Sequence, residues 1–255
     1  MNVARRHTVV AVNGLGGLEH LWASFRAALP PTVTIRVLDL PGHGDRPRPA
    51  DYHYTGLVAD VAGRTADLEP FPLVGWSVGA AVAWLFAARH PGRVTSLVLL
   101  DPAAPHQSRF REGPVPQPVH PYTYESVEVA VQVLRGIDPT TSEDDVRAGY
   151  RQNASGRWEP RFDPAIFRAL VEDARDRGEE MRRELQKVRV PTLVLRGERS
   201  FMGTDQVAEI ASALPDARVE TVPGAGHFMV REGPADVAGR VLTFLEARER
   251  DNRSA

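Results

Sequence analysis

The sequence predicts an α/β fold in which a mostly parallel sheet of about six strands is flanked by helices and interrupted by one helical insertion. Short apolar runs rich in β-branched residues alternate with longer helical patterns, as crossover units do. Each run is apolar along nearly its whole length, which is typical of strands buried on both faces. One interval, between Leu100 and Pro191, is too long for an ordinary connection.

The strands and helices follow in order along the chain. The apolar runs predict strands over residues 7–12, 33–38, 71–75, 94–100, 191–196 and 218–222. The clearest helical patterns cover residues 20–29, 55–68, 77–90, 204–214 and 234–248.

The long interval begins with a Pro-rich stretch and continues with helical patterns over residues 124–134, 142–152 and 163–187. We interpret residues 102–187 as a helical cap, or lid, over the carboxyl edge of the sheet, where α/β folds bind their ligands. Residues 1–101 and 188–255 then form the core. The alternative is that the insertion is a structural elaboration with no part in binding.

Composition narrows the function classes. A length of 255 residues fits one domain, and 31 Lys and Arg against 33 Asp and Glu give a net charge of -2. We therefore expect no nucleic acid or membrane partner, but a small-molecule substrate, with the chain as a monomer or homodimer. Cysteine is absent, which excludes disulfides and thiolate nucleophiles. The N-terminus has no apolar run long enough for an export signal, so a cytoplasmic location is expected.

A candidate nucleophile lies between the third strand and the helix that follows it. Gly75-Trp76-Ser77-Val78-Gly79 has the spacing and the context of a nucleophile elbow. A turn this sharp strains the backbone of Ser77, and the flanking glycines avoid clashes with strand and helix. The hydroxyl then lies at a helix N-terminus, where developing negative charge is stabilised.

A candidate base follows the sixth strand. His227, in Pro223-Gly224-Ala225-Gly226-His227-Phe228, lies on a loop at the same carboxyl edge of the sheet. Its imidazole can take a proton from a serine and return it to a leaving group. His43 lies in a turn and has no such placement. The chain contains no His-Glu-x-x-His pattern or other metal-ligand cluster, so we expect neither a metal nor a cofactor.

These motifs, in this order, resemble the α/β-hydrolase superfamily over nearly the whole chain. The Asn13-Gly14-Leu15-Gly16-Gly17 segment is similar to the oxyanion loop of that family, and Asp39-Leu40-Pro41-Gly42-His43-Gly44 to its turn after the next strand. The resemblance implies the α/β-hydrolase fold and an oxyanion hole formed by the amides of Leu15 and Val78. The family usually has His where this chain has Asn13.

The acid of a Ser-His-acid triad has several candidates. In the family it commonly follows the penultimate strand, but there this chain has Ser200 and Phe201, which cannot act as the carboxylate partner of an imidazole. Some members place the acid after the strand that follows the elbow helix, where this chain has Asp101. We predict Asp101 as the acid, with Glu198, Asp205 or the absence of an acid as alternatives.

The sequence thus predicts a serine hydrolase that cleaves an ester or lactone of a small apolar substrate through an acyl-enzyme. Apolar candidates for the pocket wall are Leu15, Trp76, Phe110, Phe201, Phe228 and Met229, with Trp158 from the cap. Two other functions stay open. One is non-hydrolytic chemistry in the same cavity by a cofactor-independent lyase, cyclase or oxygenase, and the other is a hydrolase-like ligand receptor.

Overall fold

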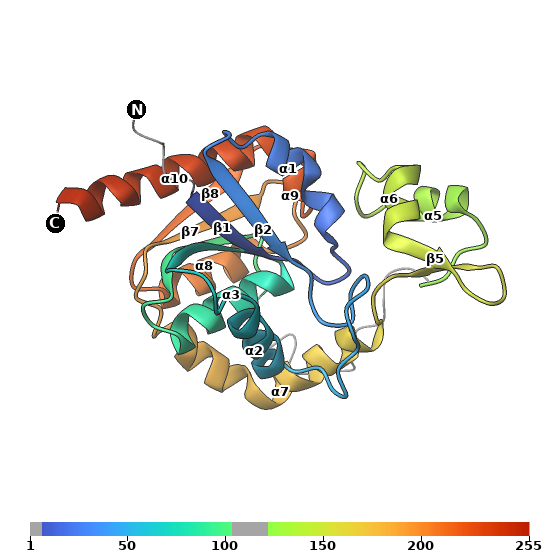
Figure 1. Cartoon of the computed structure of the whole chain (residues 1–255), viewed down its shortest axis with the longest axis horizontal. Coiled ribbons are helices and arrows are strands. Elements are labelled where there is room, and N and C mark those ends of the chain that lie inside the picture. The colour runs from blue at the N-terminus through green and yellow to red at the C-terminus, as the bar shows by residue number, and fades with distance from the viewer. Residues whose placement is uncertain (1–6, 104–121, 255) are drawn as a thin grey trace.

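A twisted sheet lies between two groups of helices, with a smaller lobe beside it (Figure 1). The structure is a computed structural model that describes residues 7–103 and 122–254. Within these residues, no helix is long and apolar enough to pass through a lipid bilayer.

The sheet has six strands, all parallel, in the order β2-β1-β3-β4-β7-β8. The predicted fold class and all six predicted strands are confirmed. Their bounds are β1 (His7–Val12), β2 (Val33–Leu38), β3 (Phe71–Trp76), β4 (Val94–Leu100), β7 (Thr192–Gly197) and β8 (Ala217–Val222). The expectation that every strand is buried on both faces is wrong for β8. It forms an edge of the sheet, and Val222 is its one buried residue.

Helices cover both faces of the sheet. One face packs against η1 (Glu19–Trp22), α1 (Ala23–Ala27), α9 (Met229–Glu232) and α10 (Pro234–Ser254). The other face packs against α2 (Tyr54–Arg64), α3 (Val78–Arg89), α7 (Ala165–Leu185) and α8 (Thr204–Ala213). The helices η1 and α1 replace the single helix predicted over residues 20–29, and α9 is additional.

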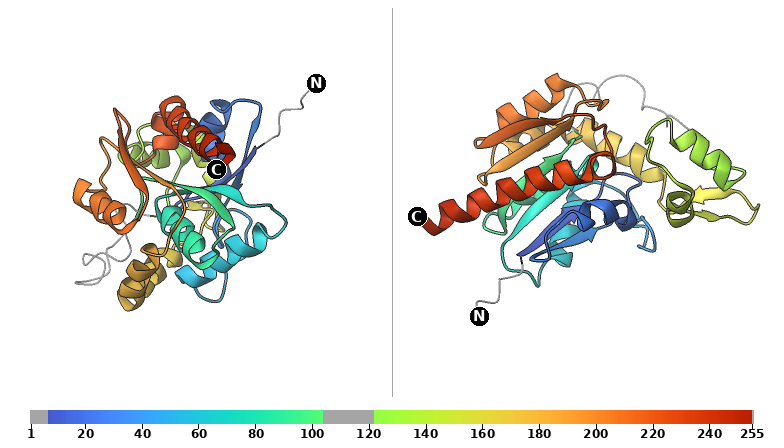
Figure 2. Two further views of the ribbon diagram at one scale, coloured as in Figure 1. Left: turned by 90° about the vertical axis from the view of Figure 1, so that its left-hand side faces the viewer. Right: turned by 90° about the horizontal axis from the view of Figure 1, so that it is seen from above.

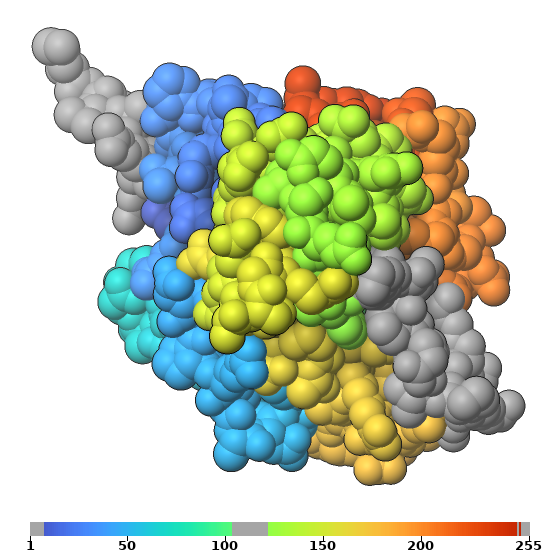
Figure 3. Space-filling view, turned by 90° about the vertical axis from the view of Figure 1, so that its right-hand side faces the viewer, coloured from blue at the N-terminus to red at the C-terminus, as the bar shows by residue number. Residues whose placement is uncertain are grey.

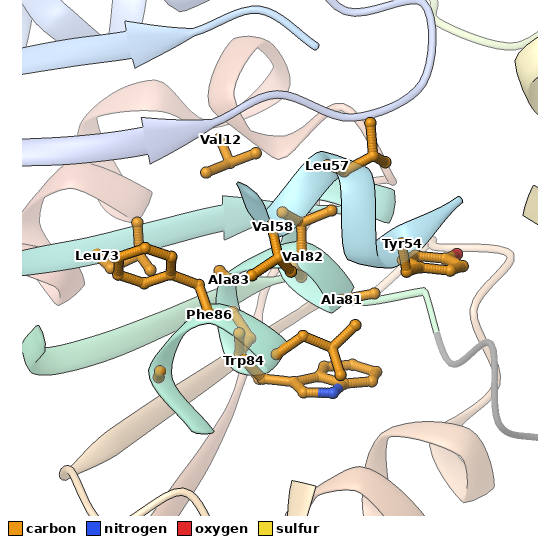
Figure 4. Packing of buried hydrophobic residues seen from close by; sticks show 14 of the residues in the cluster. Val12, Tyr54, Leu57, Val58, Leu73, Ala81, Val82, Ala83, Trp84 and Phe86 are labelled. Atoms are coloured by element: carbon orange, nitrogen blue, oxygen red, sulfur yellow. The ribbon is translucent and has the colours of Figure 1, made fainter. Parts of the chain in front are cut away.

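The helix α3 is central to the packing. Figure 4 shows Val82 and Phe86 of α3 among Val58 of α2 and Leu73 of β3. Nine consecutive residues of α3, from 79 to 87, are buried, so the helix is apolar all round, as a helix enclosed by protein must be. This enclosure holds the N-terminus of α3, and therefore the elbow before it, in a fixed place on the sheet.

The inserted segment forms the smaller lobe. It contains α5 (Val127–Leu134), α6 (Glu143–Gly149) and an antiparallel hairpin of β5 (Tyr150–Gln152) and β6 (Trp158–Pro160). The lobe has a small apolar core of its own around Tyr124, Val127 and Val146. It lies to one side of the sheet in Figure 2 and faces the viewer in Figure 3. The hairpin corrects the prediction that residues 142–152 are wholly helical.

The C-terminal part of the predicted cap, residues 102–187, packs into the main apolar cluster. Its last helical pattern forms α7, whose Ile166, Leu170 and Leu185 are buried in the same apolar cluster as α3. An amphipathic helix buries its apolar stripe against whatever surface the chain brings to it, and here that surface is formed mainly by the helix α3. Of the described residues in the insertion, 122–163 form the part that lies outside the main core.

Candidate active site

The candidate nucleophile Ser77 lies at the sharp turn between β3 and α3. Its backbone has φ 57 and ψ -119, a strained conformation for a residue with a side chain. A Cβ added at Gly75 would lie 2.4 Å from the carbonyl oxygen of Gly79, and one at Gly79 would lie 2.3 Å from that of Val12. Both flanking positions therefore exclude any larger residue, as the sequence analysis expects of an elbow.

The imidazole of His227 lies beside this hydroxyl. Its Nε2 is 3.1 Å from Ser77 Oγ. Two further contacts fix the loop that carries it: the indole N–H of Trp76 donates to the His227 carbonyl at 2.9 Å, and Glu232 accepts the amides of Gly226 and Phe228 at 3.0 and 3.1 Å. Sequence reasoning did not identify Glu232. The sequence shows only that a carboxylate follows the histidine by a few residues, and many surface helices carry a carboxylate in such a position.

Asp101 is the carboxylate that contacts His227. It directly follows β4, its side chain is 0% exposed, and its Oδ2 lies 2.5 Å from His227 Nδ1. Its Oδ1 accepts the amide of Gly197 at 3.2 Å. The alternatives lie elsewhere: Glu198 accepts the amide of Gly224 at 2.8 Å, and Asp205 is exposed in the first turn of α8.

Ser200 adds a second donor to the same carboxylate. Its hydroxyl donates to Asp101 Oδ2, the oxygen that also contacts His227, and its Oγ accepts the amide of Met202 at 2.9 Å. A serine cannot replace the acid at this position. In the structure, Ser200 instead helps to hold the carboxylate that contacts the imidazole.

These contacts form one hydrogen-bonded chain, from Ser77 Oγ through the imidazole to Asp101. A carboxylate at Nδ1 favours the tautomer with the proton on that nitrogen. Nε2 is then an acceptor facing the Ser77 hydroxyl. The arrangement can therefore remove a proton from Ser77 and hold the resulting imidazolium beside a negative charge.

The predicted oxyanion loop packs directly on the elbow. A Cβ at Gly14 would lie 3.0 Å from the Cβ of Ser77. Among the described residues, neither the Leu15 amide nor the Val78 amide donates a hydrogen bond to another residue. Two amides without a hydrogen-bond acceptor among the described residues, one on the loop beside Ser77 and one directly after it, fit the predicted oxyanion hole.

Asn13 anchors the start of this loop. Its Oδ1 accepts the indole N–H of Trp22 at 2.6 Å, and its Nδ2 donates to Asp39 at 2.7 Å. Burial raises the pKa of Asp39 above its usual range, and the bond from Asn13 opposes that shift. The asparagine that departs from the family pattern thus fixes the loop by its side chain amide.

The chain matches the family model described as "Alpha/beta hydrolase family" over residues 9–240. The chain belongs to the alpha/beta hydrolase family. The match runs from β1 into α10 and so includes the elbow, Asp101 and the His227 loop.

Relatives of this alpha/beta hydrolase include enzymes named for ester substrates. It is 24% identical over 271 residues to "Monoacylglycerol lipase abhd6-A" of Xenopus laevis, covering 94% of this chain and 75% of that protein. A shorter match, 39% identical over 94 residues, is to "Pimeloyl-[acyl-carrier protein] methyl ester esterase" of Neisseria meningitidis. It covers 36% of this chain and 34% of the esterase.

Solved structures support the fold of this hydrolase. The crystal structure of E-2-(acetamidomethylene)succinate hydrolase superposes with a TM-score of 0.77 at 23% identity, covering 94% of this chain and 91% of the other.

The hydrolase places the predicted pocket residues in different surroundings. Phe201 is exposed, and its ring centroid lies 4.3 Å from that of His227. Phe228 and Leu15 are partly buried and pack against the apolar clusters on the two faces of the sheet. Trp76 and Met229 are buried in the apolar cluster that also holds Trp22 and Val230, and the Trp76 ring centroid is 5.7 Å from that of His227.

Two predicted pocket residues belong to the insertion. Trp158 pairs with Tyr124 and packs against the small core of the lobe. Phe110 lies outside the described residues. Over residues 7–103 and 122–254, no group of three or more His, Asp or Glu side chains is arranged to hold a metal ion.

Proposed function

We propose that this alpha/beta hydrolase is a serine hydrolase that cleaves a carboxylic ester or lactone of a small apolar substrate. The observation that carries the proposal is the continuous chain from Ser77 Oγ to His227 Nε2, at 3.1 Å, and from His227 Nδ1 to Asp101, at 2.5 Å. Three elements distant in the sequence supply these groups, and each is anchored by further hydrogen bonds. The named activities of the relatives support the choice of an ester bond.

The reaction begins when Ser77 Oγ attacks the carbonyl carbon while its proton passes to His227 Nε2. The imidazolium then gives that proton to the leaving oxygen, the carbon–oxygen bond breaks, and an acyl-enzyme forms. Water then attacks the acyl carbon while one of its protons passes to His227. His227 gives that proton to Ser77 Oγ as the acyl carbon–Oγ bond breaks, which releases the carboxylic acid and restores the Ser77 hydroxyl. In a lactone the leaving oxygen stays in the same molecule as a hydroxyl group.

The amides of Leu15 and Val78 donate hydrogen bonds to the negative charge that develops on the substrate carbonyl oxygen. Each donor of this kind contributes about a hundred- to a thousandfold to the rate in serine hydrolases. The N-terminus of α3 adds a favourable dipole at the same position, because its first amides point toward the elbow.

Labelling with a fluorophosphonate tests the proposal. We expect one adduct on the wild-type chain by intact mass, because an activated Ser77 displaces fluoride from phosphorus, and no adduct on Ser77→Ala. Ser96, a buried serine of β4, supplies the matched control, since Ser96→Ala should keep the adduct. A well-folded wild type that stays unlabelled would contradict the proposal and favour non-hydrolytic chemistry or ligand binding without turnover.

Phe201 supports an apolar substrate. Its side chain is 67% exposed although it lies against the imidazole, so it offers apolar surface beside the reacting groups. We expect Phe201→Ala to raise KM about tenfold for p-nitrophenyl hexanoate, since losing an apolar contact worth about 1–2 kcal/mol weakens binding. KM for the acetate should change little, and so should the melting temperature.

Val219→Ala is the control for Phe201→Ala. Val219 is also an exposed apolar side chain, but it lies on the edge strand β8. Val219→Ala should leave KM for the acetate and for the hexanoate ester unchanged. Equal losses on acetate and hexanoate in Phe201→Ala would show that the ring acts on the imidazole rather than on the acyl group.

A further inference from the structure

His43 lies in the turn after β2 and is 0% exposed. Its ring makes two hydrogen bonds with the backbone: Nε2 is 2.9 Å from the amide nitrogen of Gly16, and Nδ1 is 3.1 Å from the carbonyl oxygen of Pro41. Because an amide can only donate, Nε2 must be the acceptor, and Nδ1 carries the proton that goes to Pro41. Burial lowers the pKa of His43 to about 4, so the ring is neutral near pH 7.

The Gly16 amide belongs to the turn that carries the predicted oxyanion donor Leu15. Gly17 donates to the carbonyl of Gly14 at 3.1 Å, and Gly16 has φ +72, so residues 14–17 form a type II turn. The central peptide of this turn joins Leu15 to Gly16, and three of its four residues are flexible glycines. In the alternative turn that peptide is flipped, and the Leu15 carbonyl would face the lone pair of His43 Nε2. The histidine therefore selects one orientation of the turn.

The insertion fixes the ring in turn. Phe162 stacks on His43 with a centroid distance of 5.4 Å and an interplanar angle of 20°. The backbone beside it is clamped on both sides: Gly44 donates to the Arg161 carbonyl at 2.5 Å, and Asp163 donates to the Gly42 carbonyl at 2.9 Å. The exit of the lobe into α7 thus holds the histidine that holds the oxyanion loop.

We propose that His43 is a positioning residue: by accepting the Gly16 amide it holds the turn of residues 14–17 in place, and with it the Leu15 amide on the preceding peptide, where that amide stabilises the oxyanion. The inference rests on the proposed hydrolase function. His43 touches neither the reacting serine nor the other triad groups in any described contact, and it acts through the Gly16 amide alone. His43 also connects the lobe to the oxyanion loop. The Phe162 ring stacks on the His43 ring, and a Cβ added at Gly16 would lie 3.2 Å from the Phe162 ring.

Two amide variants provide the test. His43→Gln brings a side-chain oxygen to about the depth of Nε2, whereas His43→Asn reaches only about the depth of Nδ1 and cannot meet the Gly16 amide. We expect His43→Asn to lower kcat for p-nitrophenyl butyrate about thirtyfold with KM within twofold, since one oxyanion donor is worth about a hundredfold or more. His43→Gln should recover most of the wild-type kcat.

A second measurement separates positioning from a loss of stability. Butylboronic acid forms a tetrahedral adduct with an active-site serine, so its Ki reports on the oxyanion hole. We expect Ki to rise in His43→Asn by about the same factor as kcat falls. His53→Asn is the matched control, because His53 Nδ1 also accepts a backbone amide, that of Gly56 at 2.9 Å, but at the N-terminus of α2. It should change neither kcat nor Ki.

The outcomes are distinct. Equal kcat and Ki for His43→Gln and His43→Asn, or losses in His43→Asn that appear equally in KM, would overturn the positioning role. If His43→Asn does not fold, His43→Phe decides, because its ring keeps the stacking on Phe162 and lacks the acceptor; unchanged kcat there would overturn the inference. Failure of the proposed function is recognised separately, as a wild-type chain that fluorophosphonate does not label.

Discussion

Asp101→Asn is expected to lower kcat by about four orders of magnitude while the chain stays folded. The amide of an asparagine offers an N–H where Asp101 offers an oxygen to His227 Nδ1. The imidazole would then adopt the tautomer with its proton on Nε2, which cannot accept from Ser77. The measurement is kcat on p-nitrophenyl butyrate, with the melting temperature by circular dichroism beside it.

The rejected acids supply the controls for this substitution. Glu198→Gln and Asp205→Asn remove carboxylates that do not contact the imidazole, and they should change kcat by less than about threefold. A near-wild-type rate in Asp101→Asn would contradict the assignment of the acid.

A second substitution can restore the carboxylate from the opposite side. The Ser200 hydroxyl and the His227 imidazole meet at the same oxygen of Asp101. Ser200→Asp in the Asp101→Asn background therefore places a carboxylate within reach of His227, and we expect kcat to rise at least tenfold over the single variant. No recovery, in a chain that folds, would show that only the β4 position orients the ring.

Gly79→Ala is expected to destabilise the fold by at least about 3 kcal/mol or to prevent folding. The added methyl group would lie 2.3 Å from the carbonyl oxygen of Val12 and 2.4 Å from that of Asn13. Both are backbone atoms at the end of β1, so relief requires α3 to move away from the sheet. Urea unfolding, followed by circular dichroism, gives the free energy of unfolding.

Gly63→Ala is the matched control for this prediction. Gly63 is also a helical glycine, in α2, but a Cβ there meets no atom within 4 Å. The substitution should stabilise the chain by about 0.5–1 kcal/mol through the smaller entropy of the unfolded state. If Gly79→Ala and Gly63→Ala change the free energy of unfolding by similar amounts, close packing at the elbow is not the reason that position 79 requires glycine.

The strands, the elbow and the His227 loop could be predicted because their signals are local. A buried parallel strand is an apolar run, and an elbow is a strand, a turn and a helix within a few residues. The acid could only be narrowed to three candidates, since the choice depends on which strand end faces the imidazole. Asp101 and His227 are 126 residues apart in the sequence, and a pattern of apolar residues does not show which distant side chains come into contact.

The roles of His43, of the β5–β6 hairpin and of α7 could not be predicted from the sequence, because they depend on contacts between distant segments or on strands that are very short. His43 reads as a turn residue, and its role depends on a partner in another loop, Gly16. The hairpin of β5 and β6 has strands of three residues each, too short to show alternation. The amphipathic pattern of α7 shows that one face is buried, but the partner of that face, α3, is set by the tertiary fold.

The proposed acid, Asp101, follows β4 and so lies on a different strand end from the segment between β7 and α8. Here Ser77 and Asp101 emerge from neighbouring, hydrogen-bonded strands, with Trp76 paired to Leu100 just before them. In the segment between β7 and α8, Ser200 contacts Asp101, and Glu198 and Arg199 contact the loop of His227 or its anchor Glu232. Loop grafting confined to residues 201–203 is therefore a route to new selectivity that keeps these contacts.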